Sequence, residues 1–285
     1  MMRKSFLFLT CFCLGTVWFG CTERRAESSD STLTDSSYIA HHLNKGGDSP
    51  LILMPTDTLK FCRDMPFVES FFENGREKAA GISTAFWPAR TTELKVYFMD
   101  GDTTVIRKVM TIANLWEPYS GIKFKQVSQD SSGDIKVSFK ANGTWSAIGR
   151  QALYKSPSMN LGWLTPSTDD LEYRRVVLHE FGHALGLIHE HQNPLSKEIK
   201  WDVEYVKNYF KPIWSEPEIE ANIFKRYQKS SINGTAYDSL SIMMYAIPAE
   251  FRLDRIATPW NRELSALDRF FVGSKYKNNP INLSR

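Results

Sequence analysis

Cysteine is scarce in this chain of 285 residues, and its scarcity argues against a fold stapled by disulfides. The chain has four cysteines, and two of them, Cys11 and Cys13, lie in the apolar stretch at the amino terminus. Cys21 ends that stretch, so Cys62 is the one thiol left for the rest of the chain. No cysteine follows residue 86, so we expect the large remainder to be stabilised without cross-links.

Long hydrophobic runs and charge of one sign are also missing. After the first twenty residues no window is apolar enough to cross a bilayer. The net charge is only +3 and no basic block is present, so we expect no nucleic-acid partner. Hydrophobic residues make up 42% of the chain and aromatic residues 13%, which is enough for one sizeable core with appendages.

The amino terminus predicts export. Arg3 and Lys4 precede an apolar segment over residues 5–17, which has the length of a signal peptide and is short for a membrane span. A glycine followed by Cys21 resembles the end of a bacterial lipobox, although two bulky aromatic residues precede it. We therefore predict a signal peptide over residues 1–21 and an outer-membrane lipoprotein of a Gram-negative bacterium, with a lipid on Cys21 as the only membrane contact. Simple secretion is the alternative.

Four of the six histidines fall within the run HEFGHALGLIHEH, which begins at His179. His179 and His183 are four residues apart, so on a helix they share one face, about 5–6 Å apart at Cβ. Gly186 can adopt the left-handed conformation that ends a helix, and the turned chain can then bring in His189. Three imidazoles leave the fourth position of a tetrahedral zinc site open for water, as in catalytic sites.

The flanks of this run predict the helix that the spacing requires. Apolar residues recur at helical intervals over residues 171–188, and residues 168–170 offer capping side chains before them. Glu180 follows the first histidine, where it can take a proton from the attacking water and pass it to the leaving group. We therefore predict one Zn²⁺ per chain, held by the three histidines, with Glu180 as general base.

The extended motif HExxHxxGxxH, followed here by Glu190, resembles the signature of the astacin branch of the metzincin zinc peptidases. Downstream, the sequence SIMMY resembles the Met-turn of that branch. Met243 matches the methionine beneath the metal, and Tyr245 matches the tyrosine that reaches it. Met244 replaces the usual histidine, which removes no ligand, so we expect activity to be retained. The resemblance implies a buried, ion-paired Glu190, whereas we expect His191 to lie in a solvated loop.

This resemblance covers about 200 residues, from Phe86 to Tyr276. It implies an α+β metzincin fold: a twisted, mostly parallel five-stranded sheet with an antiparallel edge strand, an active-site helix and a mainly helical carboxy-terminal subdomain, within a catalytic domain over residues 81–285. It implies a monomeric endopeptidase that cuts proteins or peptides, with Glu180 and Tyr245 as catalytic residues. Two other functions stay open: a catalytically silent zinc-binding module, and a zinc hydrolase of a non-peptide substrate.

Composition divides the region before this domain. Residues 22–50 are rich in Ser, Thr, Asp and Gly, which predicts a flexible tether. Residues 51–80 mix apolar and polar side chains and form a candidate pro-segment over the cleft. Within it, Cys62 or Asp64 could occupy the open position of the zinc and keep the enzyme latent. A buried free cysteine that only packs is the alternative.

Alternating apolar residues predict strands over residues 94–98, 122–124, 135–139, 150–154 and 159–164. We expect the strand over residues 150–154 to border the cleft, where the backbone of a substrate would pair with it. Helices are predicted after Asp102, over residues 203–210 and 216–227, and after Ser265.

Overall fold

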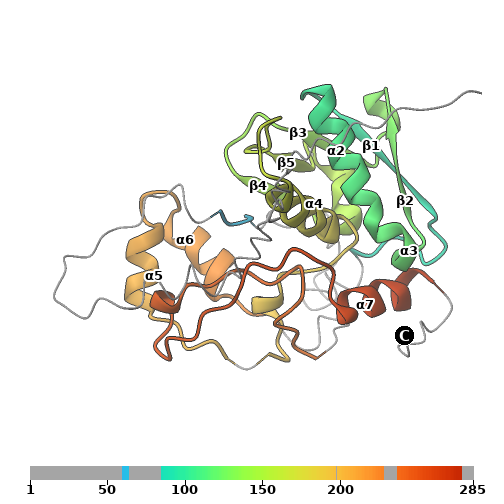
Figure 1. The fold of residues 1–285 in the computed structure, drawn as a ribbon. Helices are drawn as coiled ribbons and strands as arrows, with labels where there is room; N and C mark the ends of the chain where they lie inside the picture. The colour runs from blue at the N-terminus through green and yellow to red at the C-terminus, as the bar shows by residue number, and fades with distance from the viewer. Residues whose placement is uncertain (1–59, 64–84, 197, 228–235, 278–285) are drawn as a thin grey trace, which may run out of the picture. The chain divides into compact units, whose positions relative to one another are not determined.

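The computed structural model describes residues 60–63, 85–196, 198–227 and 236–277 (Figure 1). The predicted signal peptide, the tether and most of the candidate pro-segment, including Asp64, lie outside the described residues. Within the described part of the chain, no helix is both long and apolar enough to cross a bilayer.

A five-stranded sheet is built in the order β2-β1-β3-β5-β4. The strands are β1 (Glu93–Phe98), β2 (Lys123–Val127), β3 (Ile135–Ser138), β4 (Thr144–Ser146) and β5 (Met159–Leu161). All neighbours pair in parallel except β4 and β5, which are antiparallel with Trp145 opposite Asn160. The predicted sheet, with its one antiparallel edge strand, is confirmed.

The edge strand, however, is not the segment that we predicted. Residues 150–154 lie in a 3₁₀ helix, η5 (Gly149–Tyr154), and β4 forms the edge instead. Gly149 has φ +52°, and the apolar residues that follow, Ala152, Leu153 and Tyr154, are consecutive rather than alternating. A strand shows one face to the core through every second residue, so this run could not continue as one. The short strand β4 directly follows Gly143, and this glycine made the segment resemble a turn in the sequence.

Two long helices cover the sheet region. Helix α2 (Thr103–Ala113) begins at Asp102, whose side chain accepts from two backbone N–H groups of the first turn. Helix α4 (Asp170–Ala184) is capped by Asp169 in the same way and packs against α2 and β4 (Figure 1). Every residue of α4 from Val176 onward is buried, so this helix has no solvent face over its last turns.

The end of α4 is held by aromatic side chains. The last carbonyl groups of a helix lack partners within the helix. Here the indole N–H of Trp87 donates to the Ala184 carbonyl at 2.7 Å, and the Tyr276 hydroxyl donates to the Leu185 carbonyl at 2.6 Å. Gly186 then turns the chain with φ +96°, as its position in the motif predicts. This buried stop fixes where the chain leaves the helix.

The remaining elements are mostly short, although the last helix is as long as α2. They are η3 (Asn114–Trp116), α3 (Glu117–Ser120), η4 (Asp130–Ser132), η6 (Glu190–Gln192), α5 (Val203–Phe210), α6 (Glu216–Ile219), the π-helical turn η7 (Glu220–Phe224), η9 (Ala249–Phe251) and α7 (Ala266–Tyr276). The helix predicted over residues 216–227 is thus α6 followed by η7 and ends at Phe224. Ser265 caps α7 as expected.

Two hydrophobic clusters make up the core of the described residues. One joins the sheet to α2, α4 and α7, and the other joins α5, α6, η7 and η9. The Met-turn, Ser241–Tyr245, passes between them, because Met243 belongs to the first cluster whereas Met244 and Tyr245 belong to the second. The histidine run therefore lies where the two clusters meet.

The turn at Gly186 supplies a stability test. A Cβ there would lie 2.6 Å from the Phe86 ring, in a left-handed backbone, whereas a Cβ at Gly143 (φ +82°) would meet nothing within 4 Å. We expect Gly143→Ala to cost about 1 kcal/mol and Gly186→Ala about 2–4 kcal/mol of unfolding free energy. Urea denaturation measures both, and equal losses would contradict the role assigned to close packing at Gly186.

Candidate metal centre

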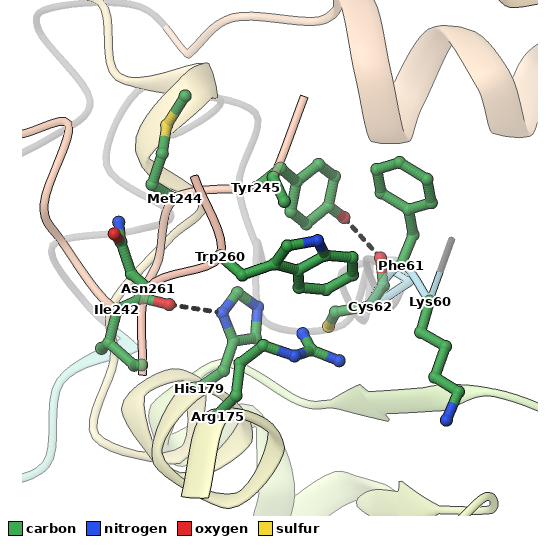
Figure 2. A pocket seen from close by; sticks show the side chains of 11 residues that line it. Lys60, Phe61, Cys62, Arg175, His179, Ile242, Met244, Tyr245, Trp260 and Asn261 are labelled. Carbon is green, nitrogen blue, oxygen red and sulfur yellow. Dashed lines mark hydrogen bonds between the residues drawn. The ribbon is translucent and has the colours of Figure 1, made fainter. Parts of the chain in front are cut away.

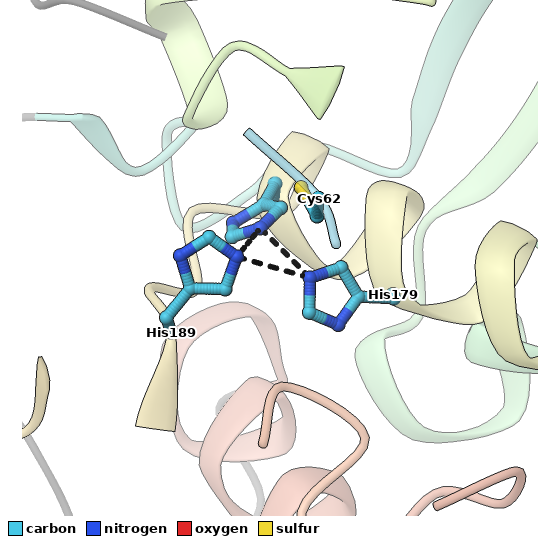
Figure 3. A group of neighbouring side chains, drawn as sticks. Cys62, His179 and His189 are labelled. Carbon is cyan, nitrogen blue, oxygen red and sulfur yellow. Dashed lines mark hydrogen bonds between the residues drawn. The ribbon is translucent and has the colours of Figure 1, made fainter. Parts of the chain in front are cut away.

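The structure brings the three predicted ligands together (Figure 3). The Nε2 atoms of His179, His183 and His189 form a nearly equilateral triangle with sides of 3.1–3.2 Å. All three side chains are buried, at 5%, 1% and 0% exposure. His179 and His183 come from adjacent turns of α4, and His189 from the chain that returns after Gly186.

Backbone carbonyl groups fix the tautomers of two rings. His179 Nδ1 lies 2.8 Å from the Ile242 carbonyl oxygen, and His183 Nδ1 lies 2.9 Å from that of Leu187. A carbonyl oxygen can only accept, so each Nδ1 carries the hydrogen and each Nε2 presents a lone pair. Two lone pairs that face each other at 3.2 Å repel unless a cation lies beside both.

The protonation and spacing of the rings fit zinc. Burial, together with the neighbouring imidazoles, holds the pKa of His179 well below its ordinary value, and burial does the same for the pKa of His189. Neutral imidazoles are the form that binds a metal. Nitrogens about 2.0–2.1 Å from a tetrahedral zinc lie about 3.3–3.4 Å apart, close to the observed triangle. The three residues therefore fit a single zinc ion.

Cys62 joins this group from the candidate pro-segment. Its Sγ and the three imidazole nitrogens lie within 4.8 Å of one another, and its side chain is buried (Figure 3). The thiol donates to the Glu180 carboxylate, with 3.3 Å between Sγ and Oε2. Glu180 is 1% exposed, so the predicted base and the one described cysteine meet beside the ligand nitrogens.

Tyr245 holds the backbone of the same segment. Its hydroxyl donates to the carbonyl oxygen of Cys62 (Figure 2). The ring of Tyr245 lies 4.4 Å from that of His189, measured between centroids. The hydroxyl is thus placed to donate to a peptide carbonyl group beside the ligands, as an oxyanion-stabilising group must be.

The expectation that His191 is solvated is wrong. His191 is 3% exposed, and its Nε2 lies 2.9 Å from the Asn222 carbonyl oxygen in η7. Its ring stacks on Tyr245 with centroids 4.3 Å apart and planes at 26°. The packing of η7 against η6 brings Asn222 near, and nothing in the local pattern indicates this contact. His191 positions the tyrosine rather than facing water.

The Met-turn packs against α4, the helix that carries His179 and His183. A Cβ at Gly182 would lie 2.5 Å from Met243 Sδ, so the glycine lets the methionine pack directly on α4. Asp268 holds the turn, because its carboxylate accepts from the Ser241 hydroxyl at 2.6 Å and from the Ile242 N–H at 2.8 Å. The sequence analysis did not single out Asp268. The capping box that it forms with Ser265 is the signal that marks it.

Glu190 has no ion-pair partner among the described residues, contrary to what the resemblance implies. Its Oε1 accepts from the Asn193 amide and from the Asp238 N–H, each at 2.9 Å. Burial raises the pKa of Glu190 to about 7. Both donors to this oxygen are neutral groups. Met244, at the position of the family histidine, is 4% exposed in the second cluster, and the three ligands converge without a histidine there.

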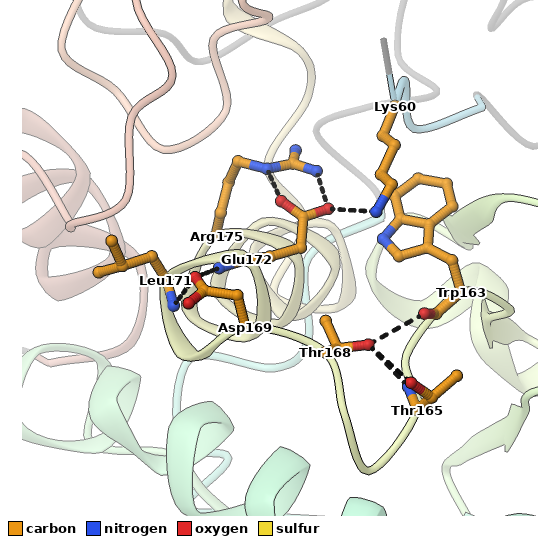
Figure 4. A network of polar contacts seen from close by, with 8 residues as sticks. All are labelled: Lys60, Trp163, Thr165, Thr168, Asp169, Leu171, Glu172 and Arg175. Carbon is orange, nitrogen blue, oxygen red and sulfur yellow. Dashed lines mark hydrogen bonds and ion pairs between the residues drawn. The ribbon is translucent and has the colours of Figure 1, made fainter. Parts of the chain in front are cut away.

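A pocket adjoins the metal centre, lined partly by Lys60, Phe61 and Cys62 of the pro-segment and by His179, Arg175 and Trp260 (Figure 2). Arg175 forms two bonds to Glu172, at 2.8 and 2.9 Å, and its guanidinium carbon lies 4.3 Å from the centroid of the Trp260 ring. Lys60 approaches the same carboxylate at 3.7 Å (Figure 4). This network connects the pro-segment to α4.

Comparison with known proteins agrees with this geometry. The model of the astacin peptidase family matches residues 83–263. A solved structure of myroilysin superposes with a TM-score of 0.65 at 36% identity, covering 70% of this chain and 98% of that one. A second myroilysin structure gives 0.57 at 33% identity, covering 78% and 93%.

Animal peptidases match as well. The zinc metalloproteinase nas-36 of Caenorhabditis elegans is 27% identical over 181 residues, 63% of this chain and 26% of that protein. Meprin A subunit alpha of Rattus norvegicus is 26% identical over 161 residues, 55% of this chain and 19% of that protein. The chain thus spans about a quarter or less of the length of these curated relatives. It belongs to the astacin family of peptidases.

Proposed function

We propose that this chain is a zinc-dependent endopeptidase that hydrolyses peptide bonds of proteins, with Glu180 as general base. One observation carries the proposal. The buried Glu180 carboxylate lies beside three converging imidazoles, in a cleft where a stretch of peptide backbone is already seated. That stretch pairs with the sheet edge, since Cys62 bridges Thr144 and the Arg63 N–H donates to the Thr144 carbonyl at 3.0 Å.

A zinc ion held by the three histidines would supply a Lewis acid that polarises a carbonyl group and lowers the pKa of water. Glu180 takes the proton of the attacking water and delivers it to the leaving amine. Tyr245 donates a hydrogen bond to the oxygen on which charge develops. The bond from Tyr245 to the Cys62 carbonyl supports this role.

The two alternatives have less support. A silent zinc-binding module has no need of a buried carboxylate next to the first histidine ligand, because burying it is costly. A hydrolase of a non-peptide substrate has no need of an edge strand that pairs with peptide backbone. Both features are present here, in Glu180 and in β4.

Glu180→Ala tests the base. We expect kcat/KM on a quenched peptide to fall by about 10³-fold while zinc content and the thermal midpoint stay near those of the wild type. His183→Ala is the matched control, because it should lose both activity and zinc. Activity and metal analysis are measured on the same preparations. A Glu180→Ala protein that cuts at the wild-type rate would refute the role of this carboxylate.

We further propose that Cys62 keeps the full chain latent. A thiol must lose its proton to bind zinc, and the Glu180 carboxylate at 3.3 Å is an acceptor for that proton. The sulfur would then be the fourth ligand of a zinc ion bound there, and Glu180 would be engaged as well. The Cys62 carbonyl is held by Tyr245, so the segment occupies the cleft with its thiol, not its carbonyl, directed at the ligands.

Two variants of the full chain distinguish the two candidate latency residues. Cys62→Ala should raise basal activity at least about tenfold, because the open position loses a strong zinc ligand. Asp64→Ala should leave basal activity at the wild-type level. Initial rates on one quenched peptide, at equal zinc content, measure both. The opposite ranking would assign latency to Asp64, and no change in either would show that Cys62 only packs.

Export through residues 1–21, with a lipid on Cys21, remains our proposal for the location of the protein. We expect labelled palmitate to be incorporated by the full chain and not by Cys21→Ala. Release of the unmodified protein into the medium would instead indicate simple secretion.

A further inference from the structure

The described part of the pro-segment, Lys60–Arg63, lies in the cleft as an extended peptide. Its backbone bridges Thr144 of the edge strand β4 in a parallel sense. An extended peptide bound to a sheet edge gains affinity from backbone pairing and selectivity from side-chain pockets. Pockets that the side chains of this segment fill are therefore available to another extended peptide that replaces it.

Phe61 fills a pocket built from four aromatic rings, which we call the aromatic pocket: Phe210, Trp214, Tyr245 and Phe251. The Phe61 centroid lies 5.1 Å from that of Phe210 and 5.2 Å from that of Tyr245, both edge to face. The Phe251 ring stacks on that of Phe61, with centroids 6.4 Å apart and an angle of 11° between the ring planes. The Trp214 ring is the fourth member of the pocket, and its centroid lies 6.5 Å from that of Phe61. These separations are those that favour aromatic pairs.

The aromatic pocket adjoins the metal ligands and the proposed oxyanion site. Phe61 precedes Cys62, whose sulfur lies with the ligand nitrogens, and Tyr245 belongs both to the pocket and to the proposed oxyanion site. Because the Cys62 carbonyl group occupies the proposed oxyanion site, the corresponding bond is the one after Cys62, and this pocket holds the side chain of the second residue before that bond. Its fit affects the position of that bond directly.

Basic side chains lie on both sides of the pocket. Lys60 approaches Glu172 at 3.7 Å and lies 5.7 Å from the Trp163 ring (Figure 4). Arg63 approaches Glu218 at 3.4 Å. The Lys60 and Arg63 side chains are 39% and 43% exposed, and exposed ion pairs contribute little. The aromatic contact therefore outweighs the charged ones.

Building on the proposed endopeptidase function, we infer that the cleft selects peptides with an aromatic side chain at the second residue before the scissile bond. Basic residues at the flanking positions are a lesser preference. The aromatic pocket provides the selectivity, and Phe61 occupies it in the latent chain. The chemical class of substrate is thus an extended peptide that pairs with β4 and places a Phe, Tyr or Trp in this pocket.

The test uses the full chain with Phe61→Ala and Cys62→Ala, which vacates the pocket and the open metal position together. Quenched peptides differ only in the second residue before the cut, which is Phe, Leu, Ala or Asp. We expect Phe at this position to raise kcat/KM at least about tenfold over Ala and Asp. Equal rates, or a preference for Asp, would overturn the inference.

Trp214→Ala in the same background trims one wall of the pocket. The ratio of kcat/KM for the Phe and Ala peptides should fall several-fold, with the Ala peptide nearly unchanged. Ile213→Ala is the matched control, since Ile213 is the neighbouring residue, is 45% exposed and is no part of the pocket. An unchanged ratio in a folded Trp214→Ala protein would overturn the inference. If circular dichroism shows that this variant does not fold, the ranking of the peptides decides alone.

Binding separates this inference from the function on which it builds. Fluorescein-labelled Lys-Phe-Ala-Arg should bind the vacated full chain at least about tenfold more tightly than Lys-Ala-Ala-Arg, measured by anisotropy. If the Phe peptide binds more tightly but no peptide is cut, the pocket stands and the endopeptidase proposal fails. If peptides are cut but neither rate nor binding depends on the aromatic residue, only the present inference fails.

Discussion

Three buried imidazoles held with their Nε2 atoms 3.1–3.2 Å apart are the constraint on which the rest of the structure depends. Buried lone pairs at this separation repel, so the arrangement requires a cation or a rigid support, and the protein provides the support. The last turns of α4 are buried on every side, and Trp87 and Tyr276 bind the carbonyl groups at its end. Gly186 then returns the third ring without strain.

A second layer of contacts orients the groups that act beside the metal. The Ile242 carbonyl fixes one imidazole, and the same residue's N–H is held by Asp268, so the Met-turn and α7 take part in ligand geometry. His191 stacks on Tyr245 and is itself anchored to η7. Both hydrophobic clusters therefore contact the residues around the metal centre, because the turn between them contributes two residues to each. A change in either cluster would displace ligands or the tyrosine.

The family resemblance implied the sheet with one antiparallel edge strand. Local patterns in the sequence predicted the convergence of the three histidines, the Asp102 and Ser265 caps and the stop at Gly186. Each depends on residue spacing or on a single backbone requirement. Local patterns failed where tertiary contacts decide. The edge strand β4 is only three residues long and is defined by its pairing with β5. The strand that we predicted over residues 150–154 is the 3₁₀ helix η5. His191 is buried by η7, which lies about thirty residues further along the chain.

The candidate pro-segment places Cys62 with the three imidazoles and Phe61 against the aromatic pocket, so the proposed latency and the proposed selectivity involve neighbouring residues. Both rest on one zinc ion bound by three imidazoles. X-ray absorption at the zinc edge of the purified full chain tests that claim most directly. The account predicts one zinc per chain with three nitrogens at about 2.0 Å and one sulfur at about 2.3 Å. A chain that binds no zinc, or zinc with fewer than three nitrogen ligands, would contradict it.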